Sequence, residues 1–306
     1  MDYKRANRAY LYMILSTIGL MLVISLWYLN GGFSLNILVN NILSEMVVLI
    51  PAVAAVLYSG ERLSVLIPFH KIRVSSAVLT FVYVIALFPL VTFVNYVSML
   101  FVENKVNSIA GEVLKMPIWL MIASVGIFGP FIEEIVFRGV LLQAYQRTGR
   151  IIGSIVISSL AFGMMHMNFN QFAYGAVMGV MLALLVEATG SVLTSFLAHA
   201  FFNTIEIVMM YATSDVLEET ETALNGYLSG VSEIVETLIY AGYLLVAAVI
   251  FTAIAILIVR KIAKNEQRFE FFVGIKNCRK QGYKLLSIPL IIAMSISFAY
   301  MLYSAL

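Results

Sequence analysis

The sequence predicts an all-α fold, a polytopic transmembrane helical bundle with about eight or nine spans. Of its 306 residues, 61% are hydrophobic and 12% are charged, and the mean hydropathy is +0.96. This apolar share is well above that of an ordinary soluble domain. The apolar residues also form runs of about 20, the length that a helix needs to cross a bilayer and about twice the length of a barrel strand.

Nine apolar runs are expected to form the spans. They cover residues 10–29, 41–59, 76–101, 117–145, 151–167, 171–188, 191–211, 235–259 and 286–305. The first follows a basic start and is predicted to be a retained span. The second is the weakest, because it contains Glu45 and Pro51. The fourth is too long for one crossing and is expected to leave the membrane as a helix after Arg138.

The basic residues indicate an orientation. With the N-terminus inside, the loops on the cytoplasmic side contain 16 of the 19 Lys and Arg residues, the excess expected on that side. This fits nine spans in a bacterial plasma membrane, with the N-terminus cytoplasmic and the C-terminus outside. Residues 212–234 are acidic and are expected to be an outer loop. Residues 260–285 are basic and amphipathic, and either lie on an anionic membrane surface or only fix the orientation.

These features divide the chain into three parts. Residues 1–116 are expected to form the N-terminal spans, and 117–211 a core with three polar motifs. Residues 212–306 would hold the acidic outer loop, the C-terminal spans and the basic cytoplasmic segment. The single Cys278 excludes an intrachain disulfide and a multi-cysteine metal site.

The first motif places three ionisable residues in an apolar run, Glu133, Glu134 and Arg138. An ionised group in hydrocarbon costs about 2.5–3.5 kcal/mol on insertion scales, so these groups must be paired, hydrated or used. Glu134 and Arg138 are four residues apart, share a helix face and are expected to form an ion pair. Glu133 points about 100° away and, when desolvated, is suited to act as a general base near neutral pH.

The other two motifs each contribute a histidine. His166 shares a helix face with the residue four positions before it, and His199 shares a face with Asn203, with Glu206 continuing that stripe. The set predicts a water activated by Glu133 and His166 that attacks a peptide carbonyl. His199 and Asn203 would then donate hydrogen bonds to the oxyanion.

Each motif also has a structural interpretation, as an ion pair, a packing histidine or a polar contact between helices. Depth is a further test. With a rise of about 1.5 Å per residue, Glu133 and His199 fall nearer the cytoplasm and His166 nearer the outside. A shared site therefore requires a fifth helix that is tilted or starts deeper.

The motifs EEIVFRG at 133–139, FGMMH at 162–166 and HAFFN at 199–203 occur in order within 71 residues. They resemble those of the CAAX-protease and bacteriocin-processing family, also called the Abi family of intramembrane glutamic endopeptidases. The resemblance covers about residues 117–211. It implies a catalytic core of about four helices and no cofactor, in a family that also includes scaffolds and immunity factors.

The resemblance implies a role for each matching residue. Glu133 would activate the water with His166 as its partner, and His199 and Asn203 would stabilise the oxyanion. The supporting residues would be Glu134 and Arg138.

Four functions therefore stay open. The first is a metal-independent endopeptidase that cleaves membrane-associated peptides or proteins, or a prenylated tail. The second is a zinc protease, since two His and one Glu can hold zinc with an open position, although the chain has no HExxH motif. The third is a non-catalytic immunity or regulatory protein with a membrane-protein partner. The fourth is a proton-relay transporter, against which the lack of repeated halves argues. The expected partners include the lipid bilayer and no nucleic acid.

Overall fold

The structure is a computed structural model that describes residues 1–227, 233–275 and 284–305, without the side chains of Asn107 and of residues 214–234. Over these residues the chain is helical and contains no strand, as predicted. Eight of the described helices are long and apolar enough to cross a membrane, so the chain is an integral membrane protein. The longer separate helices are α1 (Tyr3–Leu29), α2 (Ile37–Leu57), α4 (Val74–Met99), α10 (Phe169–Thr189), α11 (Val192–Tyr227), α12 (Glu233–Asn265) and α14 (Ile288–Ala305).

The remaining candidate span is one continuous helix, Ile118–Gln146, whose hydrogen-bonding pattern changes along its length. Its successive parts are α6 (Ile118–Met121), η1 (Ile122–Phe128), α7 (Gly129–Glu134), η2 (Ile135–Leu141) and α8 (Leu142–Gln146), of which η1 and η2 are π-helical. Pro130, at the start of α7, has no N–H to donate to the turn before it. Such π-helical turns are frequent at functional sites, and here they flank the two adjacent glutamates.

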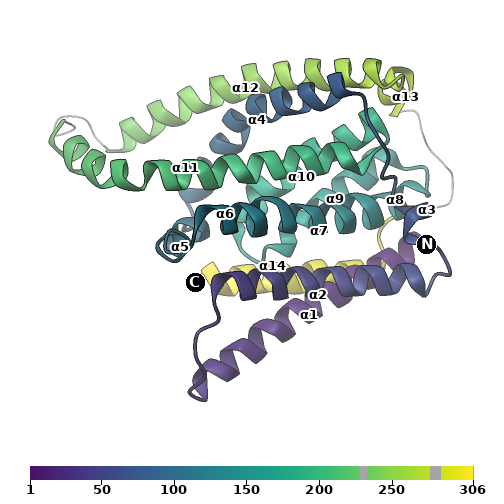
Figure 1. Cartoon of the computed structure of the whole chain (residues 1–306), viewed down its shortest axis with the longest axis horizontal. Helices are drawn as coiled ribbons and strands as arrows, with labels where there is room; N and C mark the ends of the chain where they lie inside the picture. The colour runs from purple at the N-terminus through teal and green to yellow at the C-terminus, as the bar shows by residue number, and fades with distance from the viewer. Residues whose placement is uncertain (228–232, 276–283, 306) are drawn as a thin grey trace.

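The fifth expected span is a shorter helix than the others. Helix α9 (Ile151–Met165) has 15 residues, about 22 Å at the usual rise, and is below the length of a full crossing. It nevertheless runs from one end of the bundle toward the other between α8 and α10, and the two termini lie at opposite ends of the bundle (Figure 1). Short elements complete the fold: α3 (Leu63–Leu66), α5 (Lys105–Val113) and α13 (Phe269–Gly274).

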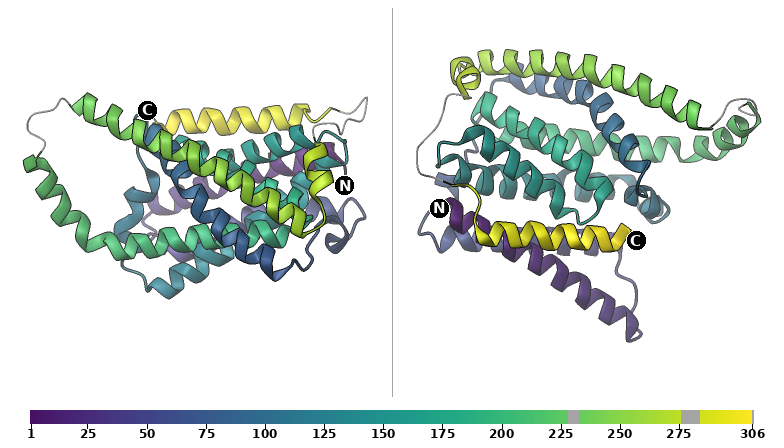
Figure 2. Two further views of the ribbon diagram at one scale, coloured as in Figure 1. Left: turned by 90° about the horizontal axis from the view of Figure 1, so that it is seen from above. Right: turned by 180° about the vertical axis from the view of Figure 1, so that it is seen from behind.

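The two largest of the four buried clusters in the described residues organise the interior. One joins α1, α2, η2, α9 and α14, and the other joins α4, α10, α11 and α12. Helices α4 and α12 lie side by side at one edge, α1, α2 and α14 lie at the other, and α7, α9 and α10 lie between them (Figures 1 and 2). Large apolar side chains on the outer helices are exposed, as expected for a surface that faces lipid.

The acidic stretch expected to be an outer loop is largely helical, which corrects the prediction for residues 212–234. Helix α11 continues to Tyr227, and α12 begins at Glu233. The stretch contains no Pro, and its first Gly is Gly226, so nothing in its composition ends the helix earlier. In the basic stretch 260–285, α12 extends to Asn265 and α13 follows, while residues 276–283 lie outside the described part of the chain.

Candidate active site

The predicted ion pair of Glu134 and Arg138 forms on the helix Ile118–Gln146. Nη1 of Arg138 lies 2.7 Å from Oε1 of Glu134, and both side chains are buried. The Arg138 guanidinium also lies 4.3 Å above the centre of the Phe162 ring and donates to the carbonyl of Gly179 on α10 at 3.4 Å. Glu134 and Arg138 therefore fix α7 and η2 against α9 and α10.

His199 connects the two glutamates. Its Nδ1 lies 3.0 Å from Oε1 of Glu134, and its Nε2 lies 3.5 Å from Oε2 of Glu133. A carboxylate only accepts hydrogen bonds, so Nδ1 carries the hydrogen that it shares with Glu134. Nε2 then faces Glu133, whose side chain is one-fifth exposed while that of Glu134 is fully buried. One glutamate orients the imidazole, and the other stays accessible.

His166 is held by the backbone where α9 ends. Its Nδ1 lies 3.0 Å from the carbonyl oxygen of Phe162, one turn earlier. A carbonyl also only accepts, so Nδ1 carries the hydrogen and Nε2 is left as an acceptor. Met167 follows in the left-handed conformation with φ of 56°, and Asn168 donates to the His166 carbonyl at 2.8 Å and caps α10. This turn sets the direction of the ring.

Asn203 lies one turn after His199 on α11. Its amide donates one hydrogen bond, of 3.2 Å, to the carbonyl of Val125 in η1. The amide nitrogen carries two hydrogens, so one N–H remains for another acceptor. Glu206, further along the same helix, also lines the cavity described below.

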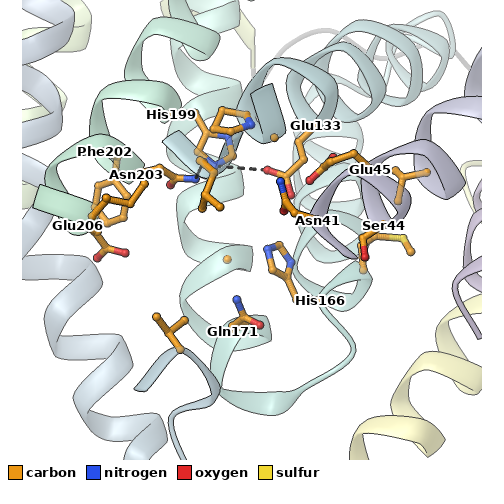
Figure 3. A pocket seen from close by; sticks show the side chains of 18 of the residues that line it. Asn41, Ser44, Glu45, Glu133, His166, Gln171, His199, Phe202, Asn203 and Glu206 are labelled. Atoms are coloured by element: carbon orange, nitrogen blue, oxygen red, sulfur yellow. Dashed lines mark hydrogen bonds and ion pairs between the residues drawn. The ribbon is translucent and has the colours of Figure 1, made fainter. Parts of the chain in front are cut away.

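These side chains meet at one cavity of about 440 Å³. Glu133, His166, His199 and Asn203 all line it, and Figure 3 shows Glu133 and His166 pointing into the same space from different helices. The four residues predicted to be catalytic are thus brought together, although a straight count of helix rise places His166 at another depth. Among the described residues, the imidazole within 4 Å of the Glu133 carboxylate is that of His199, at 3.5 Å, and not that of His166.

The zinc alternative requires His and Glu side chains that converge on one point. Among the described side chains, no group of three or more His, Cys, Asp or Glu residues is arranged to hold a metal ion. His199 and His166 both line the cavity. The Nδ1 atom of His199 is hydrogen-bonded to Glu134, and that of His166 is hydrogen-bonded to the carbonyl oxygen of Phe162.

Sequence comparison identifies the part of the chain that carries the site. Residues 115–205 match the family described as "Type II CAAX prenyl endopeptidase Rce1-like". This segment is referred to below as the CAAX-protease core, after the family that it resembles. It contains all six of the predicted site residues and four helical spans, Ile118–Gln146, α9, α10 and most of the apolar part of α11.

A curated relative points in the same direction. The chain is 27% identical over 130 residues to the "Putative membrane peptidase YdiL" of Bacillus subtilis (strain 168). The match covers 42% of this chain and 52% of the relative, so the chain spans about half the length of the curated relative that it matches. No solved structure matches the chain.

The cavity extends beyond the CAAX-protease core, which the sequence did not predict. Helices α1, α2 and α5 also line it, so its wall includes more than the four helices expected. Glu45 of α2 is the clearest residue missed. The sequence offered a signal for it, because Glu45 is an ionisable residue inside an apolar span.

Phe162 is a second residue that was missed as a contributor. Its ring packs edge-on against both His166 and His199, with ring centres 5.2 and 5.7 Å apart, and it supports the Arg138 guanidinium on its face. It is buried and aligns the two histidines across the site. Its place at the start of the FxxxH motif was the only sign of this role in the sequence.

Proposed function

We propose that the chain is a membrane-embedded endopeptidase that hydrolyses membrane-associated peptides or proteins with a water activated by Glu133. The observation that carries this proposal is the position of His199 between Glu134 and Glu133, on the wall of a cavity that His166 and Asn203 also line. The similarity to a CAAX prenyl endopeptidase family and to a protein named as a membrane peptidase supports the reaction class.

The geometry suggests how each group takes part. A water beside Glu133 transfers a proton to that carboxylate, while its second hydrogen is donated to Nε2 of His166. This arrangement directs the oxygen lone pair toward the peptide carbonyl. The tetrahedral intermediate then carries an oxyanion, which preorganised donors stabilise strongly in a site that excludes water.

The oxyanion donors would be His199 and Asn203. His199 would donate through Nε2, the nitrogen that faces Glu133. Asn203 contributes the amide hydrogen that is not bonded to Val125.

The orientation is part of the same proposal. Under the cytoplasmic excess of Lys and Arg, the bundle end that carries the N-terminus faces the cytoplasm of a bacterial cell. The C-terminus, at the opposite end of the bundle (Figure 1), then lies outside.

The decisive experiment compares wild type with Glu133→Gln in the host. We expect uncleaved membrane peptides to accumulate in the variant, because a carboxamide cannot accept the proton of the attacking water. The comparison is made by peptide mass spectrometry of membranes from cells with equal amounts of inserted protein. A biological effect that survives in well-folded Glu133→Gln would instead indicate the non-catalytic partner function.

A chelator separates the zinc alternative. Purified protein is assayed on the accumulated peptide with and without a zinc chelator. Cleavage at an unchanged rate is expected for a glutamate-activated water, and loss of cleavage that returns with added zinc would indicate a metalloprotease.

A further inference from the structure

Glu45 is a buried carboxyl group at the cavity. It lies on α2 and lines the cavity with 9% of its surface exposed. In the described part of the chain, Glu45 makes no hydrogen bond or ion pair. It also lies outside the segment that matches the CAAX-protease family, residues 115–205, so no comparison assigns it a role.

The carboxyl of Glu45 lies against the turn of α7 that carries Glu133. A Cβ atom placed on Gly129 would be 3.2 Å from Oε1 of Glu45. Gly129 is one turn before Glu133, on the same helix face, and a helical side chain leans back toward the N-terminus of its helix. The two carboxyl groups consequently approach each other, as Figure 3 shows, and they are close enough to interact electrostatically.

The described lining residues place no fixed positive charge beside this pair. The titratable groups on the walls that face Glu45 are Glu133 from α7, His166 after α9, Tyr174 from α10, and His199 and Glu206 from α11. The described lining includes no Lys or Arg, and the nearby Arg138 is bonded to Glu134. Two adjacent carboxyl groups in a buried site cannot both be ionised at low cost, so such a pair retains one proton.

We propose that Glu45 is a second catalytic carboxyl group, which donates its proton to the nitrogen of the leaving amine. This inference rests on the proposed peptidase function. Glu133 accepts one proton from the attacking water as the new C–O bond forms. Glu45 then protonates the amide nitrogen as the C–N bond breaks, and an amine and a carboxylic acid are released. The proton on Glu133 returns to Glu45, so one water is consumed and both groups are restored.

The test uses a leaving group whose departure depends much less on a proton. An internally quenched peptide that carries the cleavage site found with Glu133→Gln is compared with its depsipeptide, in which an ester oxygen replaces the scissile nitrogen. We expect Glu45→Gln to lower kcat on the amide roughly 100-fold, the contribution of a general acid, and to lower kcat on the ester only a few-fold. Glu45→Asp, which keeps an acid, should recover part of the amide rate.

The amide-to-ester ratio is measured on one preparation, so it does not depend on how much of a variant is folded. Glu187→Gln is the matched control, because Glu187 is a buried carboxyl of α10 that does not line the cavity and is bonded to Gln146. Its ratio should equal that of wild type.

The outcomes separate this inference from the proposed function. Equal losses on amide and ester in Glu45→Gln, or no loss on either, would overturn the role of Glu45 while leaving Glu133 as the base. Cleavage of the amide by Glu133→Gln at the wild-type rate would overturn the proposed function itself.

Discussion

At the scale of single residues, the geometry of the site depends on a short chain of ionisable groups. Arg138 contacts Glu134, Glu134 contacts His199, and His199 faces Glu133, with separations of 2.7, 3.0 and 3.5 Å. Each group restricts the next, so Glu133 meets an imidazole whose ring orientation is fixed. Preorganisation of this kind matters because a catalytic group that is misplaced by about 1 Å can cost 100-fold in rate.

The first prediction at this scale concerns the buried ion pair. We expect Glu134→Gln to lower the free energy of unfolding by about 3 kcal/mol, because it leaves Arg138 as a buried charge without its partner. The measurement is chemical unfolding in detergent micelles. Replacing both residues, as Glu134→Leu with Arg138→Met, should destabilise less than the single change, because no uncompensated charge remains.

Glu206→Gln is the control for the loss of a carboxylate. Glu206 lines the same cavity and makes no hydrogen bond or ion pair in the described part of the chain, so its replacement should change stability little. Equal stability of Glu134→Gln and Glu206→Gln would contradict a structural role for the ion pair.

The residues that the sequence predicts best are those related by local spacing. Glu134 and Arg138 lie four apart on one helix, and this spacing alone predicted their ion pair. The contact of His199 with Glu134 joins residues 65 positions apart. It depends on how α11 packs against α7, and no local pattern contains that information. The expected pairing of Glu133 with His166 was a choice that spacing could not decide.

At the scale of helices, α9 and α10 approach closely because small residues line their contact. A Cβ atom on Gly163 would lie 2.8 Å from the backbone of Phe172 and Ala176, and one on Gly179 would lie 2.8 Å from Ser159. Such small residues let helices in a membrane approach backbone to backbone. The contact also places the His166 ring next to Gly175 of α10.

Gly163→Ala should therefore destabilise the protein. The added methyl group meets backbone atoms that cannot move independently, and overpacking of this kind costs about 1–3 kcal/mol. The measurement is the unfolding midpoint in detergent. Gly19→Ala is the matched control, because a Cβ on Gly19 of α1 meets nothing within 4 Å. That change should be neutral or slightly stabilising, and equal effects of the two substitutions would contradict the close contact.

The sequence predicted the positions of the spans better than it predicted the ends of the helices. The apolar runs predicted the spans well, since apolar length and composition determine them. The acidic stretch after the seventh run was expected to be a loop because it is polar, but polarity does not end a helix. The π-helical turns around α7 also leave no distinct mark in an apolar sequence, apart from Pro130.

At the scale of the whole molecule, the cavity lies where the two buried clusters meet. Phe162 belongs to the cluster of α1, α2, α9 and α14, while Phe202 belongs to that of α4, α10, α11 and α12. The CAAX-protease core supplies the predicted catalytic groups, and α2 closes the cavity from outside that core. The wall of the cavity is thus formed partly by helices that carry none of the three motifs.

The orientation of the bundle leads to the last prediction. Among the described residues there are eight candidate spans and the shorter α9. The loop after α1 and the end of α14 lie at the same end of the bundle, opposite the N-terminus (Figure 1). Cysteines are introduced singly at the exposed residues Asn30, Lys71 and Ser304, in a background with Cys278→Ser. Intact cells are then treated with a membrane-impermeant maleimide.

We expect Asn30→Cys and Ser304→Cys to be labelled in intact cells, and Lys71→Cys to be labelled only after permeabilisation, because Lys71 belongs to the basic end of the bundle. An odd total number of crossings puts Ser304 on the side opposite the N-terminus, which is also the side that Asn30 reaches after the first crossing. If Ser304→Cys is labelled only after permeabilisation, as is expected for Lys71→Cys, then α9 does not cross the membrane. The chain would then return to the side of the membrane where α8 ends, and the position of His166 at the same depth as the other two motifs would need another explanation.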